Sequence, residues 1–553
     1  GSTTTLVSTM RPRYLPRLAL FWLVAAGVTS LMWAATSSFV QREYEQLTAL
    51  IAWLGIDEFT GSPATVPQQT QVVALDRLTG AAKFGDGAGV VDLAWTPSPH
   101  VKGLRVTTRL GGPGQPMRDV DGADALVIGT IRMGFGHHRI AYAAASWGVK
   151  SGSSKDEAAF PSGVYFHDLL SIESAEAGLI RDTDKIYRTS SRLATELGGP
   201  FEWLHGYMTS SGDATSLRTT ALVAARLAPL VRGLPRGCAF VATHSLTALA
   251  ATLSNITDRV LNLVIDNHPQ WFVVSPGALN LMQGPRNYLG FVAKTGSTRG
   301  LRWAGHWVPR DVVDNVVADC DARIARAVAR GGATPGTKVP PLRVLVPVGG
   351  AGAQRHFITS LVERLADDVK AGTVALVLNA GDHADIQDAL VETLRASGLV
   401  GDDALKSSFL RVSTMAEARG LAAALGKKMA GGPRVALMAF DDYFAAVAAT
   451  DTLARVVDVL ACKPSELAFY PVPKLMIRRV GDHEAFSANR ANELGDGTEE
   501  LRTVDAALTY LRLFAADPEP LLVMNAAIKR NAAAGVYDGC KTATELAGRV
   551  VSS

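Results

Sequence analysis

The chain repeats one local pattern along most of its length: a short apolar run, a turn, and a helix-like stretch. The apolar runs are rich in valine, isoleucine and leucine, and they cover residues 125–131, 238–244, 261–266, 342–350, 374–380 and 434–440. Uninterrupted apolar strands that alternate with helices are typical of parallel sheets covered by helices on both faces. The sequence therefore predicts an α/β fold built from parallel sheets.

Residues 331–341 (GGATPGTKVPP) are the best candidate for a domain boundary, because glycine, proline and threonine crowd there without an apolar period. They separate two α/β blocks of comparable size. Two Rossmann-like lobes with a central cleft describe the GT-B architecture, in which ligands bind at the carboxyl ends of the strands. The expected division is 1–41 for an N-terminal tail and membrane anchor, 42–120 for a connecting region of uncertain structure, 121–335 for the N-terminal lobe, 336–515 for the C-terminal lobe and 516–553 for a C-terminal helical segment.

The N-terminal region contains a stretch that suits a lipid bilayer. Residues 18–40 carry no charged side chain, and a helix needs roughly 20 apolar residues to cross the hydrocarbon layer. They predict a single-pass N-terminal transmembrane helix; a cleaved secretory signal and a buried core helix are the alternatives. Arg11, Arg13 and Arg17 precede the stretch, so the positive-inside rule places the body of the protein on the non-cytoplasmic side.

Composition narrows the possible functions. The formal net charge is only +3 over 553 residues, and no basic stripe with interleaved aromatic residues occurs, so a nucleic-acid partner is not expected. The four cysteines, Cys238, Cys320, Cys462 and Cys540, are widely scattered and form no CxxC pair. This spacing argues against a structural zinc site and against a disulfide framework, and buried thiols are the simplest interpretation.

A glycine-rich segment, GFGHHR (134–139), directly follows the predicted strand that ends at Ile131. Its glycines permit a tight turn and a close approach of the backbone to a ligand, and the helix that follows offers free N–H groups. A histidine at such a junction can accept a proton from a hydroxyl near neutral pH. The alternative is a structural turn with surface histidines.

A second glycine-rich segment, VGGAGAQ (348–354), follows the first predicted strand of the second lobe. Backbone amides of such a loop can bind a diphosphate, although a plain strand–helix turn has the same composition. Asp441 and Asp442 follow another strand. We interpret them as acidic residues at a helix N-terminus rather than as a metal-binding pair.

Four segments of the first lobe resemble, in order, the GT28-like family of monogalactosyldiacylglycerol synthase and the peptidoglycan transferase MurG. GFGHHRIAYAA (134–144) resembles the glycine-rich loop of that family, which ends in a histidine. ATHS (242–245) resembles its strand-end A-T-H motif. VID (264–266), Trp271 and SPG (275–277) resemble its V-T-D strand, its tryptophan and its P-G pair.

The second lobe carries the most extensive similarity. The segment 348–354 resembles the loop that opens the donor-binding half in that family. DVLACKPSEL (458–467), PVPKLMI (471–477), GDHE (481–484) and Asn489 then follow the order of the family's D-V-L-x-x-K-P-G-G, G-L-P-x-I and G-Q-E-x-x-N-A motifs. The chain departs from them where Ser465 and Glu466 replace the paired glycines and where His483 replaces the glutamine.

The resemblance implies that the first lobe takes the acceptor and the second lobe the donor. It implies that His137 is the general base that deprotonates the acceptor hydroxyl, with His138 as the fallback, and that Glu466 accepts hydrogen bonds from the donor ribose. The expected acceptor-side residues are Gly134, Gly136, Arg139, His244, Asp266 and Trp271. The expected donor-binding residues are Gly349, Gly350, Gly352, Gln354, Lys463, Ser465, Glu466, His483, Glu484 and Asn489.

These features together predict a membrane-associated glycosyltransferase. It would move a sugar from a nucleoside-diphosphate sugar, with UDP as the expected nucleotide, to a hydroxyl of a membrane lipid or lipid-linked glycan. Neither a metal nor a further cofactor is expected, because helix-end amides would stabilise the departing diphosphate. A nucleotide-sugar 2-epimerase and a degenerate, non-catalytic GT-B scaffold subunit are the alternatives.

Overall fold

The structure is a computed structural model. It describes residues 89–132, 135–149, 163–178, 180–181, 184–185, 189, 214–332, 339–349, 352, 354–400, 409–427, 432–481 and 484–549. The stretch 18–40, predicted to span a membrane, lies outside the described residues, as do Gly134, Gly350 and His483. Within the described ranges, no helix combines the length and the apolar character that crossing a bilayer requires.

The first lobe is built on a nine-stranded sheet with the strand order β3–β1–β2–β5–β4–β6–β7–β8–β9. From β2 outward through β9 every neighbouring pair is parallel, whereas β1 pairs antiparallel with β2 and β3. The strands are β1 (Leu93–Pro97), β2 (Leu104–Arg109), β3 (Gln115–Pro116), β4 (Ala125–Thr130), β5 (Gly163–Asp168), β6 (Ala239–Ala242), β7 (Val260–Leu263), β8 (Leu279–Met282) and β9 (Leu301–Trp303).

Helices bury both faces of this sheet. Along β4, Val127 packs into a core with α8 and α9, whereas Leu126 and Ile128 pack on the opposite side with α5. Both faces of the strand are therefore apolar, which explains its uninterrupted apolar sequence. The helices of this lobe are α5 (Gly136–Gly148), α8 (Ala214–Arg232), α9 (Ser245–Ser254) and α10 (Pro285–Thr295).

The second lobe has a six-stranded, fully parallel sheet in the order β12–β13–β11–β10–β14–β15. Its strands are β10 (Leu342–Pro347), β11 (Val374–Asn379), β12 (Phe409–Val412), β13 (Val435–Met438), β14 (Val459–Cys462) and β15 (Lys474–Met476). Its helices are α13 (Arg355–Arg364), α14 (Ala366–Ala371), α15 (Ala384–Ala396), α16 (Met415–Lys427), α17 (Tyr443–Ala454), α18 (Ala485–Leu494), α19 (Val504–Ala516) and α20 (Glu519–Ala533). One face of the sheet packs against α13, α15 and α19, and the other against α16 and α17. The predicted α/β fold with parallel sheets is confirmed.

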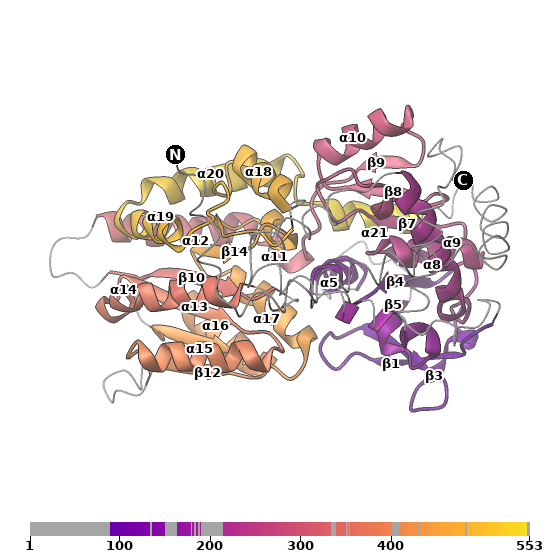
Figure 1. Cartoon of the computed structure of the whole chain (residues 1–553), viewed down its shortest axis with the longest axis horizontal. Coiled ribbons are helices and arrows are strands. Elements are labelled where there is room, and N and C mark those ends of the chain that lie inside the picture. Colours follow the sequence, from indigo (N-terminus) through magenta and orange to yellow (C-terminus); the bar gives the residue numbers. More distant parts are fainter. Residues whose placement is uncertain are drawn as a thin grey trace, which may run out of the picture.

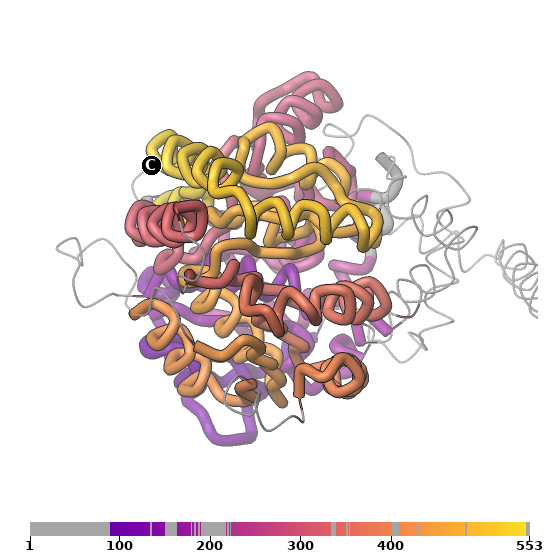
Figure 2. Tube along the Cα trace, turned by 90° about the vertical axis from the view of Figure 1, so that its left-hand side faces the viewer, coloured from indigo at the N-terminus to yellow at the C-terminus, as the bar shows by residue number. Residues whose placement is uncertain are grey.

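The chain crosses between the lobes twice (Figure 1). After β9 come α11 (Arg310–Asp314) and α12 (Val316–Gly331), and α12 packs against α20 of the second lobe. The last helix, α21 (Gly539–Arg549), returns to the first lobe and packs against α5, β6 and β7. Figure 2, which looks onto the second lobe, shows α12 beside the yellow C-terminal helices.

These crossings correct the expected domain division. The boundary at 331–341 comes after α12, which already belongs to the second lobe. The segment 516–553 is not one unit, because α20 and α21 pack on different lobes. In addition, residues 93–116 of the expected connecting region supply β1, β2 and β3 to the first sheet.

A buried charge cluster anchors α12 to the second lobe. The carboxylate of Asp458 lies 2.7 Å from Nε of Arg326 and 3.0 Å from Nη1 of Arg330, and it accepts a 3.0 Å hydrogen bond from the backbone N–H of Arg343. Burial alone would raise the pKa of Asp458, but the guanidinium groups of Arg326 and Arg330 outweigh burial and hold this pKa below its usual range. The cluster therefore joins α12 to the amino-terminal ends of β10 and β14.

Candidate active site

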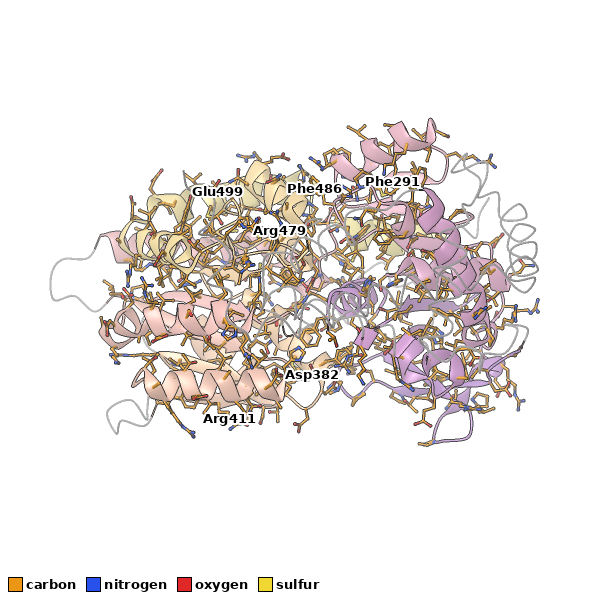
Figure 3. The ribbon with its side chains drawn as sticks, viewed as in Figure 1. Phe291, Asp382, Arg411, Arg479, Phe486 and Glu499 are labelled. Atoms are coloured by element: carbon orange, nitrogen blue, oxygen red, sulfur yellow. The ribbon has the colours of Figure 1, made fainter. Side chains whose placement is uncertain are left out.

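The carboxyl ends of the parallel strands of both sheets lie at the junction between the lobes. Side chains that follow these ends touch across it: the ring of Phe135 lies 5.5 Å from that of His383 and 6.4 Å from that of Tyr443. Figure 3 labels Asp382 and Phe486 where the second lobe meets the first. Parallel α/β sheets bind ligands at this edge, so the junction between the lobes is the candidate site.

Ion pairs and ring contacts hold one margin of the junction closed. Arg132 of the first lobe forms an ion pair with Asp382 of the second, and its guanidinium lies 4.0 Å from the ring centre of Tyr443. His100 and Asp442 are also within ion-pair distance across the junction. Asp442 caps α17 by accepting a 2.8 Å hydrogen bond from the backbone of Phe444, which confirms its interpretation as a helix N-terminal acid.

A second margin is held by Phe486, which is labelled in Figure 3. Its ring is stacked 4.5 Å from that of His268 and lies 3.9 Å from the guanidinium of Arg286, and both of these residues belong to the first lobe. The backbone carbonyl of Phe486 accepts a 3.1 Å hydrogen bond from the side chain of Asn267. Contacts at two separate places therefore keep the lobes together.

Arg139 pins the lobes together at the centre of the junction. Its Nη1 lies 2.6 Å from Oδ1 of Asp451 on α17, which also accepts a 2.9 Å hydrogen bond from the hydroxyl of Tyr470. Burial raises the pKa of Asp451 to about 6, although Arg139 opposes that rise. The expectation that Arg139 contacts the acceptor is corrected, because its guanidinium is buried and already engaged by the second lobe.

His137 is half-buried at the start of α5, and its ring is held in one orientation. Its Nδ1 lies 2.7 Å from the backbone carbonyl of Thr243, which can only accept, so Nδ1 carries the proton. The Nε2 atom of the neutral ring is then a proton acceptor. Burial lowers the pKa of His137, and the hydrogen bond to Thr243 and the charge of Asp266 only partly oppose this. The ring is therefore neutral near pH 7, as a general base must be.

His138 points elsewhere. Its ring is buried between Phe166, 5.5 Å away, and Tyr443, 4.6 Å away, and its Nε2 lies 3.4 Å from the carboxylate of Asp168. A ring enclosed in this way has no room for an acceptor hydroxyl. His138 is thus a packed neighbour of the site, which corrects its expected role as the fallback base.

The structure places His244 beside His137, with ring centres 4.3 Å apart. His244 caps α9, because its Nδ1 accepts a 3.1 Å hydrogen bond from the backbone N–H of Leu246. The negative charge of Asp266 raises the pKa of His137, so Asp266 lies near the two histidines. Trp271, in contrast, is packed in the core of the first lobe with its ring 6.2 Å from that of Phe291. The expectation that Trp271 contacts the acceptor is corrected by this burial.

The described residues of the predicted diphosphate loop, Val348, Gly349, Gly352 and Gln354, lie between β10 and α13. Gly352 and Gln354 both have positive φ angles, 62° and 72°, and the side-chain amide of Gln354 donates to the carbonyl of Arg478. A side chain at position 349 would stand 2.9 Å from Cε of Lys463, so glycine there lets the lysine lie over the loop backbone. The end of β10 therefore brings Gly349 and Lys463 together, and their role in binding a donor stays a prediction.

The other donor-side residues divide into engaged and exposed groups. Lys463 pairs with Glu484, which also accepts a 2.8 Å hydrogen bond from the backbone N–H of Val480. Ser465 is half-buried just ahead of Glu466, whereas Asn489 is exposed on α18. The structure thus presents Glu484 as a buried partner of Lys463 rather than as an open ligand group.

Glu466 reaches across to the first lobe. A Cβ atom at position 136 would stand 3.1 Å from its Oε2, and its Oε1 lies 3.9 Å from Nε of Arg139. Glycine at position 136 therefore leaves room for the carboxylate of Glu466 beside the start of α5. The negative charge of the Glu466 carboxylate also raises the pKa of His137, so Glu466 lies near the candidate base.

Sequence reasoning missed the residues that hold the lobes together. Tyr443, Asp451, Tyr470 and Phe486 each contact a first-lobe side chain. The sequence marks them only as aromatic or acidic residues of ordinary helices and loops. Over the described ranges, no group of three or more His, Cys, Asp or Glu side chains is arranged to hold a metal ion. All four cysteines are free and buried, as predicted.

Two sequence families match successive parts of the chain. Residues 84–293 match "Domain of unknown function (DUF6937)", and residues 297–548 match "Domain of unknown function (DUF6938)". The two ranges meet ahead of β9, well before the boundary expected at 331–341. The search of curated proteins found no match.

Three solved structures are similar to this chain at low sequence identity. UDP-GlcNAc 2-epimerase from Neisseria meningitidis is 10% identical, with a TM-score of 0.39, over 75% of this chain and 97% of that one. O-GlcNAc transferase from Thermobaculum terrenum is 12% identical, with a TM-score of 0.32, over 95% and 79%. Trehalose 6-phosphate synthase from Burkholderia multivorans is 13% identical, with a TM-score of 0.37, over 77% and 98%. Likeness at this level assigns no reaction to this chain.

Proposed function

We propose that this chain is a GT-B glycosyltransferase that moves a sugar from a nucleoside-diphosphate sugar, with UDP as the first candidate, to an acceptor hydroxyl. One observation carries the proposal. His137 stands at the junction of two parallel α/β lobes with its Nδ1 bonded to the carbonyl of Thr243, so its Nε2 can accept a proton. The donor would lie on the second-lobe side and the acceptor on the side of His137.

The proposed reaction is a direct displacement. The acceptor hydroxyl gives its proton to Nε2 of His137, and its oxygen forms a bond to the anomeric carbon. The bond from that carbon to the diphosphate oxygen breaks, and the electron pair leaves with the nucleoside diphosphate. The amides at the start of α13 would face the departing diphosphate, and Lys463 lies over the same loop. A membrane-bound acceptor is supported only by the charge-free stretch 18–40.

A nucleotide-sugar 2-epimerase is the second candidate, and one observation favours it. The negative charges of the Asp266 and Glu466 carboxylates both raise the pKa of His137, so these carboxylates lie near the ring. An epimerase needs acid and base groups around its sugar.

Incubating the protein with UDP sugars in D2O distinguishes the candidates. A transferase should release free sugar slowly or transfer it to an added alcohol, without deuterium at C2. Deuterium at C2 of the recovered nucleotide sugar would replace the transferase with an epimerase, and the absence of both reactions would leave a non-catalytic binding role.

The proposed contact of Glu466 with the donor ribose predicts a loss of affinity. Glu466→Gln exchanges one acceptor oxygen for a donor group, and hydrogen bonds to charged groups contribute about 1.5–3 kcal/mol. We expect calorimetric titration to show that UDP and UDP sugars bind roughly tenfold or more weakly to the variant. A 2′-deoxy donor should bind more weakly than the ribose donor to wild type, but nearly equally to the variant.

Asp451→Asn is the matched control for this experiment. It also removes a second-lobe carboxylate that lies near Arg139, but from α17 rather than from the 3₁₀ helix (Glu466–Phe469) that follows β14. If both variants weaken UDP binding to the same extent, Glu466 acts by holding the lobes together. Unchanged UDP affinity in Glu466→Gln would remove Glu466 from the donor site.

A further inference from the structure

Two histidines of the first lobe lie side by side and are anchored in opposite senses. The ring centres of His137 and His244 are 4.3 Å apart, and the ring planes are inclined by 37°. Each ring is held through its Nδ1 by a backbone group. For His137 that group is the carbonyl of Thr243, at 2.7 Å, and for His244 it is the N–H of Leu246, at 3.1 Å.

These partners fix where the ring protons are. A carbonyl can only accept, so Nδ1 of His137 carries a proton; an N–H can only donate, so Nδ1 of His244 carries none. In neutral rings, His137 then presents a lone pair at Nε2 and His244 presents an N–H at Nε2. Burial lowers the pKa of both rings, His138 further lowers the pKa of His137, and His137 further lowers the pKa of His244, which keeps both rings neutral near pH 7.

We propose that His137 and His244 form an acceptor–donor pair that binds two neighbouring oxygens of an uncharged polyhydroxyl acceptor. His137 accepts the proton of the attacking hydroxyl, and Nε2–H of His244 donates to the oxygen beside it. This inference rests on the proposed function, because it assigns His244 as a second residue in contact with the substrate. It also names the acceptor class: a sugar or polyol end with adjacent hydroxyl groups.

The charges around the pair favour an uncharged acceptor. The negative charges of Asp266 and Glu466 both raise the pKa of His137, so both carboxylates lie near the pair. The guanidinium of Arg139 already forms an ion pair with Asp451. An anionic acceptor such as a sugar phosphate would therefore be repelled by these carboxylates. Arg139 would not offset the repulsion, because its charge is already paired with Asp451. A neutral hydroxyl pair meets one fixed acceptor and one fixed donor at no such electrostatic cost.

The competing explanation is that His244 serves only as the N-cap of α9. Two substitutions separate the roles. His244→Asn keeps a good capping side chain but is too short to place an N–H where Nε2 stands. His244→Gln places a side-chain N–H farther out but is a poor cap. A capping role predicts that the glutamine variant is the damaged one, whereas a donor role predicts that the asparagine variant is.

The first experiment measures the ring protons directly. In ¹⁵N-labelled full-length protein without substrate, imidazole ¹H–¹⁵N correlation spectra should show His137 protonated only at Nδ1 and His244 only at Nε2 between pH 6.5 and 8. The signals are assigned by their loss in His137→Gln and His244→Asn. Matching tautomers, or a doubly protonated ring at pH 7, would overturn the pair whether or not the protein transfers sugar.

The second experiment tests the acceptor class without relying on turnover. Methyl glucoside is titrated into the labelled protein in the presence of UDP, with glucose 6-phosphate as the anionic probe. We expect methyl glucoside to shift both Nε2 signals, glucose 6-phosphate to shift neither, and His244→Asn to weaken the interaction about tenfold. His244→Gln should retain most of it. Shifts with the phosphate alone, no shifts with either probe, or full binding by His244→Asn would overturn the proposal. The proposed sugar transfer, in contrast, is decided by the products formed from UDP sugars.

Discussion

Replacing His137 with glutamine should lower kcat/KM for sugar transfer by about 10²–10⁴, the usual loss when a general base is removed. Glutamine is uncharged and of similar reach, so the junction should stay closed and UDP should bind with unchanged affinity. The bond from Nδ1 to Thr243 and the lowered pKa of the ring both point to Nε2 as the base. The measurement is steady-state transfer from a UDP sugar to an alcohol, paired with calorimetric titration of UDP.

The pH profile provides an internal control for this prediction. Because the pKa of His137 is lowered from 6.5, the base is already deprotonated at neutral pH. The rate should therefore be level from pH 7 upward and fall only as the pH drops below 6.5. The acid limb should disappear in His137→Gln. Wild-type turnover in that variant would contradict the assignment, as would an acid limb centred above pH 7.

Asp458→Asn should lower the free energy of unfolding by about 3–5 kcal/mol, because it leaves Arg326 and Arg330 buried without their counter-charge. The matched control is Asp321→Asn on the same helix, α12. Asp321 also reaches the second lobe, through Lys529 of α20, but this pair is solvent-exposed and should contribute less than about 1 kcal/mol. Urea titrations of both variants give the comparison. Equal, small losses would show that the buried cluster does not hold α12 in place.

The sequence predicts the strands of both sheets well, but it does not predict which lobe each helix packs against. Strands such as β4 and β10 are buried on both faces, so the apolar run itself carries the structural information. The apolar periodicity of a helix, in contrast, indicates that one face of the helix is buried. It does not indicate which lobe covers that face. For that reason the crossings of α12 and α21, and with them the true domain division, could not be predicted from local pattern.

The candidate site was predictable to the extent that its parts are local. His137 is part of a strand–turn–helix pattern, and Asp442 is an acidic residue at the start of a helix. Both patterns can be recognised in a short stretch of sequence. The role of Arg139 depends on Asp451, which lies 312 residues away in the chain, and no local pattern carries that contact. Trp271 shows the opposite error, since a motif-like tryptophan proved to be packed in the core beside Phe291.

We propose that the junction between the lobes binds a nucleoside-diphosphate sugar. Thermal unfolding of the full chain with a panel of nucleoside diphosphates and their sugars tests it most directly. Ligand at a hundred times its Kd should stabilise the folded state by about 2.7 kcal/mol, and we expect UDP and at least one UDP sugar to do so. The same ligands should stabilise His137→Gln equally, because the base lies on the acceptor side. If no nucleotide or nucleotide sugar raises the unfolding temperature at millimolar concentration, the junction is not a donor site.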